Sequence, residues 1–178
     1  MKNYNLFANG DNSAEEAKNR YQPMPIPAKL NEICLFLKNE KISLSTSSSD
    51  GRVNSSINED ELLKIIKKQF DIQIPKSRAW YDFVIETENE FLPVNIKITD
   101  TTHADNLNCK LGIYYALTGL KPDFANEIDW LSYFERLKEH LGKVKTNDYY
   151  FLIVNKKSKE DIFVNGLKGL SLLQPQRQ

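Results

Sequence analysis

The sequence has no excess of charge of either sign, because its 24 lysine and arginine residues balance 24 aspartate and glutamate residues. A chain without net charge has no overall field to attract a polyanion, so a nucleic-acid surface would have to be a local patch. The sequence also lacks the apolar segment of a signal peptide near its start and any uninterrupted apolar run of roughly 18 residues. We therefore expect a soluble cytoplasmic protein with no membrane partner.

Cysteine is equally scarce, since only Cys34 and Cys109 occur, far apart and without the C-x-x-C or Cys/His spacing of zinc sites. This scarcity argues against a disulfide framework or a structural zinc site, and it favours two reduced, buried thiols. The 178 residues are enough for one domain with its own core. Residues 1–27 are polar and then rich in proline, which predicts a flexible N-terminal arm before a single domain over residues 28–178.

Hydrophobic periodicity and turn residues predict an α/β (α+β) chain with the order helix, helix, strand, strand, helix, helix, strand, strand. A serine-rich loop over residues 43–56 is expected to separate the first two helices. The expected ranges are 28–40 and 58–70 for these two helices, 80–100 for a hairpin, 105–119 and 126–141 for the next two helices, and 149–155 and 161–166 for the last two strands.

Capping residues set the expected ends of the helices. Asn58 is the expected N-cap of the second helix, where the acids that follow it would suit the positive end of the helix dipole. Asp105 is expected to cap the third helix and Gly119 to end it. In the fourth helix the spacing predicts one inward-facing stripe, formed by Trp130, Phe134, Leu137 and Leu141.

The hairpin segment, WYDFVIETENEFLPVNIKITD over residues 80–100, places charged residues among apolar ones. If its turn centres on residues 88 and 89, residues whose numbers sum to 177 face one another. Asp82 then lies opposite Asn95, with Cβ atoms about 5 Å apart. Because side chains alternate along a strand, Asn95 and Lys97 share one face.

Two interpretations of this face are open. Asp82 and Lys97 can form a solvated surface pair, worth about 0–1 kcal/mol. Alternatively, carboxylates on this face hold a hard divalent ion, and the lysine steadies an attacking hydroxide or the charge on a phosphate group. Pro93 bears on both, because proline cannot donate to a strand ladder and usually marks an edge or a bulge.

The aspartate of YDFVIE, followed in the next strand by the NIK of PVNIKIT, resembles the PD-(D/E)xK nuclease motif of small type II restriction endonucleases. The stretches GRVNSSINEDELL (residues 51–63) and ADNLNCKLGIYYALTG (residues 104–119) are similar to the helix before the family's hairpin and the helix after its catalytic lysine. The resemblance implies a restriction-endonuclease-like core, in which a mixed central sheet is flanked by helices. Its order of helix, three strands, helix and strand would fit residues 58–155, with a short first strand near residues 71–74.

The resemblance also implies roles for particular residues. Asp82 would be a metal ligand and Lys97 the catalytic lysine, and Glu59 would be a further acid at the start of its helix. Family members usually have Asp or Glu where this sequence has Asn95, whose amide oxygen can coordinate a hard cation without adding charge. The implied Mg²⁺ site consists of Asp82, Glu59 and Asn95, which together with Lys97 form the implied catalytic set. Glu86 is a second candidate for the missing charge.

Three residues near this motif, His103, Asn106 and Lys110, are those that we expect to contact DNA. Ordinary structural roles remain open for some of the candidates. Glu59 would suit the helix dipole without binding a metal, and His103 would be a simple loop residue.

The function implied by the resemblance is that of a type II restriction endonuclease, which hydrolyses double-stranded DNA at a specific sequence with Mg²⁺ as its cofactor. Such an enzyme would act as a homodimer, because one active site cuts one strand. Its genetic partner would be a cognate DNA methyltransferase. Two alternatives remain: a catalytically impaired DNA-binding or accessory protein that keeps the nuclease fold, and an unrelated α/β protein whose hairpin imitates the motif.

Overall fold

A computed structural model describes residues 24–40, 51–76, 79–99, 109–124, 129–144, 146–158 and 160–170, with residues 51–56 described in their backbone alone. Its helices are α2 (Ala28–Asn39), α3 (Gly51–Gln69), α4 (Lys110–Thr118) and α5 (Trp130–His140), and the short 3-10 helix η1 (Leu167–Gly169) follows the last strand. The strands are β1 (Phe83–Glu86), β2 (Phe91–Thr99), β3 (Tyr150–Asn155) and β4 (Ile162–Gly166). None of the helices within these ranges has the length and apolarity that crossing a membrane requires.

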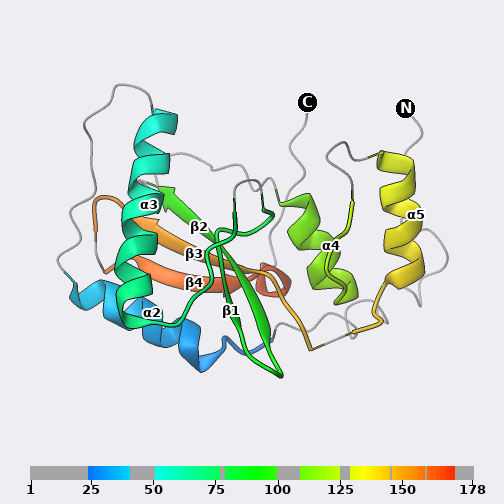
Figure 1. Ribbon diagram of the computed structural model, residues 1–178, viewed down its shortest axis with the longest axis horizontal. Coiled ribbons are helices and arrows are strands. Elements are labelled where there is room, and N and C mark those ends of the chain that lie inside the picture. Colours follow the sequence, from blue (N-terminus) through cyan, green and yellow to red (C-terminus); the bar gives the residue numbers. More distant parts are fainter. Residues whose placement is uncertain are drawn as a thin grey trace.

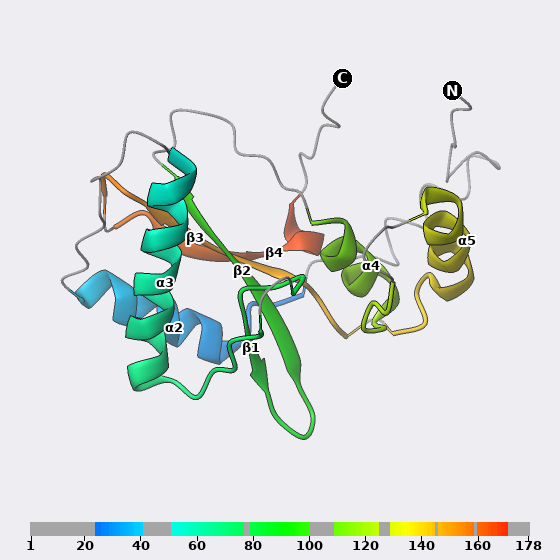
Figure 2. The ribbon, with the colours of Figure 1, turned by 45° about the horizontal axis from the view of Figure 1, so that its top comes forward.

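The four strands form one mixed sheet in the order β1-β2-β3-β4. β2 pairs antiparallel with β1 and parallel with β3, and β3 pairs antiparallel with β4. Parallel neighbours need a crossover connection, and here that connection carries α4 and α5. α2 and α3 pack on one face of the sheet, whereas α4 and η1 lie together on the other side (Figure 1, Figure 2). The predicted mixed sheet flanked by helices is therefore confirmed.

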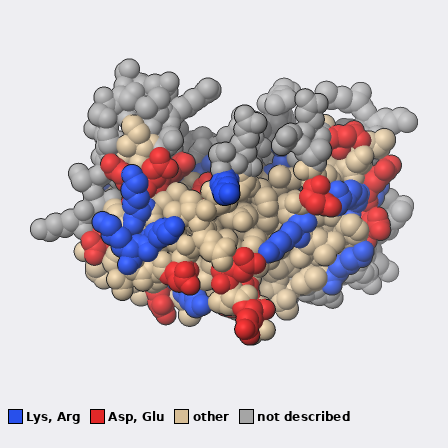
Figure 3. All heavy atoms as spheres, in the orientation of Figure 1, with Lys and Arg blue, Asp and Glu red and all other residues tan. Residues whose placement is uncertain are grey.

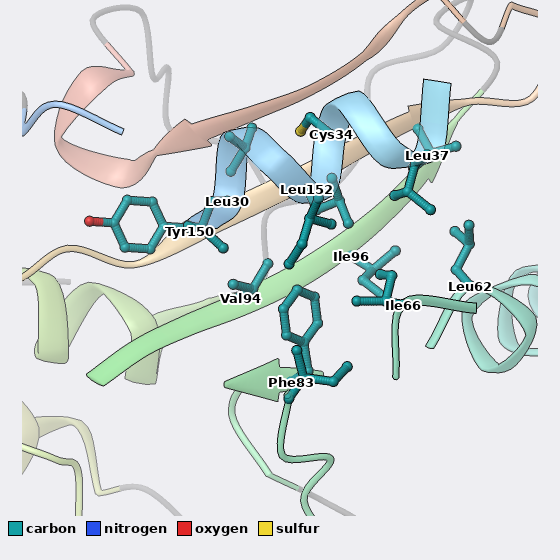
Figure 4. Close-up of a cluster of buried hydrophobic side chains, with 14 of the residues drawn as sticks. Leu30, Cys34, Leu37, Leu62, Ile66, Phe83, Val94, Ile96, Tyr150 and Leu152 are labelled. Atoms are coloured by element: carbon teal, nitrogen blue, oxygen red, sulfur yellow. The ribbon is translucent and has the colours of Figure 1, made fainter. Parts of the chain in front are cut away.

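The main core lies between the sheet and the helices α2 and α3. Alternate residues of β2 turn toward these helices, so that Val94 and Ile96 lie in one buried cluster with Leu30 of α2 and Leu62 of α3 (Figure 4). The residues between them, among them Asn95, belong to the opposite face, because successive side chains of a strand point to opposite sides. One strand thus anchors the core on one face and presents polar groups on the other.

The hairpin has the predicted register. The pairs run from Phe83 opposite Val94 to Glu86 opposite Phe91, and each pair of residue numbers sums to 177. In the turn, the N–H of Thr87 donates to the carbonyl of Glu90 at 2.9 Å. The register holds because the turn is short and because each strand buries one apolar face.

Pro93 lies at a local edge of the sheet, as expected, and not at a bulge. It pairs with Val84 in an uninterrupted ladder, and β2 has a partner strand on each side. The ladder between β2 and β3 begins only at Val94 and Tyr150. Pro93 therefore precedes the part of β2 that is paired on both sides, where a missing N–H would cost a hydrogen bond.

The start of α3 differs from the prediction. The helix begins at Gly51, so residues 51–56 are not part of a loop and Asn58 is not an N-cap. Asn58 is fully buried and lies one turn before Leu62, which is also fully buried. The inward-facing stripe of the helix therefore continues through a polar residue, and the helix forms despite the weak helix propensity of the glycine, asparagine and serines in its first turns.

The two crossover helices are shorter than predicted. α4 has Cys109 as its N-cap, without a side-chain capping bond, whereas the expected cap Asp105 lies outside the described residues. Gly119 does end the helix, in a left-handed conformation with φ 74°. α5 begins at Trp130 because the Asp129 side chain accepts hydrogen bonds from the N–H groups of Leu131 and Ser132.

The predicted inward stripe of α5 is only partly correct. Leu137 is buried, but Trp130 is 53% exposed and Leu141 is 39% exposed. Tyr133 is buried instead and packs on Tyr114 of α4, with ring centroids 6.1 Å apart. α5 contacts α4 rather than the sheet, so a narrow line of side chains is covered and the rest of the stripe faces outward.

Candidate active site

Asp82 lies directly before β1 and is hydrogen-bonded to the backbone of β2 on both sides of Asn95. Its own N–H donates to the carbonyl of Val94 at 2.9 Å. Its carboxylate oxygen Oδ2 accepts the N–H of Ile96 at 2.6 Å. The N–H of Ile96 lies beyond the start of β1, where no strand carbonyl accepts it. The side chain of Asp82 accepts it instead. This arrangement places Asp82 where the register predicted it, next to Asn95.

The surroundings of Asp82 favour its protonated form. Burial raises the pKa of the carboxyl above its ordinary value, while the hydrogen bond from Ile96 and the positive charge of Lys97 lower it by less. Lys97 is thus close enough to act on the carboxylate, although the two form no ion pair within 4.0 Å among the described contacts. The ammonium of Lys97 therefore interacts electrostatically with the carboxylate of Asp82.

Asn95 and Lys97 occupy alternate positions of β2 and so lie on the same face, as predicted. Both side chains are half-buried. Among the residues that the structure describes, neither side chain makes a hydrogen bond or an ion pair. Two polar side chains held on a rigid strand without partners are available to bind a ligand.

An aromatic cluster that the sequence did not indicate as part of the site holds the segment before Asp82. The hydroxyl of Tyr149 donates to the carbonyl of Trp80 at 2.8 Å. The two rings are stacked with centroids 5.9 Å apart, and the Trp80 ring also lies 5.3 Å from that of Tyr115 in α4. The residue two positions before Asp82 is therefore fixed to both the sheet and a helix.

Cys109 is a second neighbour of the site that the sequence left as a buried thiol. Its side chain is half-buried, and neither it nor Cys34 forms a disulfide. Burial raises the pKa of the Cys109 thiol, and the charge of Lys97 lowers it by less. Because Lys97 acts on both Asp82 and Cys109, the start of α4 borders the same polar face.

The two further acids do not stand where the resemblance placed them. Glu59 lies in the middle of α3 and not at its start, so the helix-dipole argument for this residue is wrong. Its helix packs through Leu62 and Ile66 on the apolar face of the sheet. Glu86 ends β1 about 13 Å along the strand from Asp82. Its carboxylate binds Lys121 at 2.9 Å, so it cannot supply charge beside Asp82.

The donor set fits Mg²⁺ only in part. Within the described ranges, no three His, Cys, Asp or Glu side chains come together as metal ligands. Asp82 has one carboxylate oxygen committed to Ile96, and Asn95 adds a neutral amide oxygen. Hard divalent cations favour such oxygen ligands, but a single carboxylate makes a weak site. A further oxygen ligand would have to complete it.

The residues expected to contact DNA are only partly described. His103 and Asn106 lie outside the described residues, in the segment 100–108. Lys110 is the first residue of α4, and its Nζ lies 4.8 Å from the centroid of the Trp130 ring, which ties α4 to α5. Figure 3 shows basic and acidic side chains interspersed over one face of the molecule, as expected for a chain without net charge.

Comparison of the chain with known protein families, curated proteins and solved structures finds no match.

Proposed function

We propose that the chain is a Mg²⁺-dependent nuclease of the type II restriction endonuclease kind, which hydrolyses phosphodiester bonds of double-stranded DNA at a specific sequence. One observation carries the proposal: the carboxylate of Asp82 binds the N–H of Ile96, the residue between Asn95 and Lys97. The acid of the motif is thereby held beside the part of β2 that carries the lysine.

The order of elements supports the same proposal. α3 is followed by a single bridge between Gln73 and Val84, by the hairpin of β1 and β2, by α4 and α5, and by β3. β2 and β3 are parallel, and the connection between them carries α4 and α5. The resemblance to PD-(D/E)xK nucleases implies the same order, except that the Gln73 bridge stands in place of a full first strand and α5 is added before β3.

The residues of this chain would divide the work as follows. The Lys97 ammonium would neutralise charge on the phosphate oxygens and orient a water molecule for in-line attack. Asp82 and Asn95 would hold Mg²⁺ together with a further oxygen ligand, which Glu59 does not supply because its helix packs on the opposite face of the sheet. A bound Mg²⁺ would supply positive charge next to the scissile phosphate. The aromatic cluster around Trp80 would keep Asp82 in place.

A second candidate function is DNA binding without cleavage. Two observations favour it: Asn95 brings no charge, and Oδ2 of Asp82 is already engaged by the backbone of β2. A protein with these features would retain the fold and the lysine, but it would bind Mg²⁺ too weakly for efficient hydrolysis.

Incubation of the purified full chain with Mg²⁺ and mixed-sequence plasmid DNA separates these functions. Discrete fragments that disappear in Lys97→Ala support the nuclease, and Lys138→Ala, which removes an exposed lysine of α5, serves as the matched control. Retention of DNA on a gel without fragments supports the binding protein. Absence of both cleavage and binding at low salt would contradict both proposals.

Two further parts of the proposal concern partners. Cleavage of both strands would call for a homodimer with two-fold symmetry. Protection of the host genome would call for a DNA methyltransferase with the same recognition sequence. Sedimentation of the protein on a short duplex that carries the cleaved sequence tests the dimer, because one duplex should then bind two chains.

A further inference from the structure

A cavity of about 580 Å³ lies at the turn end of the hairpin, away from Asp82. Its walls are the segment Met24–Pro27, the turn between β1 and β2, the end of α4 and the segment that leads into β3. Cavities of this size usually accommodate small molecules. It contains none of the residues Asp82, Asn95 and Lys97 and takes no part in the proposed cleavage.

One polar group in the walls, the hydroxyl of Tyr150, forms no hydrogen bond with a described residue. Tyr150 as a whole is 3% exposed, and Figure 4 shows its ring beside Leu30 and its hydroxyl directed out of the hydrophobic cluster. The ring is therefore held in the core while the hydroxyl at the wall of the cavity is positioned to meet a ligand.

The charge of the walls selects the kind of ligand. All the charged side chains among the described lining residues are acidic, namely Glu86, Glu88 and Glu90. Negative charge repels a phosphate or a carboxylate and attracts a cation.

The rim of the cavity already binds one cation of the chain itself. The Nζ of Lys121 lies 2.9 Å from Oε1 of Glu86 and 3.8 Å from the centroid of the Phe91 ring. Glu86 and Phe91 both line the cavity. An ammonium group bound by a carboxylate and the face of an aromatic ring is a common form of cation recognition. Glu88 and Glu90 leave negative charge for a second one.

We propose that this cavity binds a small aliphatic compound with ammonium or guanidinium groups, such as a diamine. One cationic group lies near Glu90, and an N–H donor of the compound binds the hydroxyl of Tyr150. The methylene chain packs against Pro25, Pro27 and Phe91, which are apolar parts of the walls.

Calorimetric titration of the full chain with putrescine and agmatine tests the proposal, with 1,4-butanediol and glutarate as neutral and anionic probes of similar length. We expect the cations to bind and the other two to fail. Tyr150→Phe and Glu90→Gln should each raise the dissociation constant about threefold to tenfold, because each removes one polar contact. Glu135→Gln removes an exposed acid of α5 that does not line the cavity, so it should change nothing.

The proposal is overturned if neither cation binds, if butanediol binds as tightly as putrescine, or if Glu135→Gln weakens binding as much as Glu90→Gln. Glu90 is exposed, so its variant tests the proposal even where Tyr150→Phe disturbs folding.

Discussion

The ring of Tyr149 fills the space that a side chain at Gly112 would need. A Cβ placed on Gly112 would lie 2.7 Å from Cδ1 and Cε1 of Tyr149, closer than real Cβ atoms approach other atoms. This contact lets α4 pack directly on the end of the sheet. The same tyrosine donates its hydroxyl to the carbonyl of Trp80, so the approach of the helix and the position of the segment before Asp82 are linked.

Gly112→Ala should therefore destabilise the fold by about 1–3 kcal/mol, because overpacking outweighs the better helix propensity of alanine. Gly142→Ala is a useful comparison, since a Cβ there meets nothing within 4 Å and only the positive φ of 70° opposes it. That strain should cost about 1 kcal/mol. Urea denaturation measures both, and an unaffected Gly112→Ala would disprove the tight packing of α4.

Tyr149→Phe removes the hydroxyl and keeps the ring. The lost hydrogen bond should cost about 0.5–1.5 kcal/mol of stability, and DNA cleavage should fall as well because the segment before Asp82 loosens. Tyr114→Phe is the matched control, since its hydroxyl is hydrogen-bonded to Nδ1 of His140 in α5 at 2.7 Å, away from the site. A similar loss of stability with normal cleavage is expected for that variant. If both lose cleavage equally, Tyr149 has no positioning role.

Asp82→Asn should separate stability from activity. Burial raises the pKa of Asp82, so the folded chain binds its proton more tightly than the unfolded chain does. The contribution of this carboxyl to stability is therefore present in acid and is lost as the pH rises from the ordinary value of 3.8 through the raised pKa. Asparagine keeps an acceptor for the N–H of Ile96 without the charge.

We expect this variant to lose cleavage and to be more stable than the parent near neutral pH by about 0.5–1 kcal/mol. The difference should shrink in acid, where Asp82 is protonated. Urea denaturation across this pH range measures it, with Asp71→Asn at an exposed position as the control. A difference that stays constant with pH would show that the charge of Asp82 is not the cause.

Asn95→Asp should strengthen the binding of Mg²⁺ by about tenfold, because a second carboxylate adds charge beside Asp82. Without the metal, the two acids repel each other, so the variant should be less stable in EDTA. Titration of cleavage against Mg²⁺ measures the first effect. Asn165→Asp, on β4, controls for the added charge. An unchanged Mg²⁺ midpoint would mean that position 95 does not touch the metal.

The two thiols should differ in reactivity. Burial raises the pKa of Cys34 to about 11, and its side chain is 7% exposed. Cys109 is half-buried, and Lys97 opposes the effect of burial on its thiol pKa. Iodoacetamide should modify Cys109 first, and Lys97→Ala should slow that reaction because it removes the positive charge. Mass spectrometry identifies the modified residue, and faster labelling of Cys34 would contradict this arrangement.

The hairpin was predictable because the residues that determine its register are close together in the sequence. A short turn and one apolar face per strand fix the register, and the alternation of side chains then places Asn95 and Lys97 on a common face. α2 and the strands β3 and β4 were predictable for the same reason, since their patterns repeat over a few residues.

The rest depended on contacts between distant parts of the chain. α3 extends back to Gly51 although its first turns contain weak helix formers, so local propensity did not indicate its length. Trp130 faces outward because α5 packs mainly on α4. The bond between Tyr149 and Trp80 joins residues 69 positions apart, and no periodicity indicates it. The glycine inside the pattern of α4 was the one local sign that another group approaches closely.

The Asp82 carboxylate has one oxygen in the pairing of the strands and leaves the other for the proposed metal site. If that site binds Mg²⁺, no change at this position can serve one purpose without affecting the other. Most replacements would break the start of β1, whereas asparagine would keep an acceptor for Ile96 and discard the charge. A descendant that gave up the proposed cleavage and kept its shape would most simply carry asparagine at position 82, and would gain stability by the change.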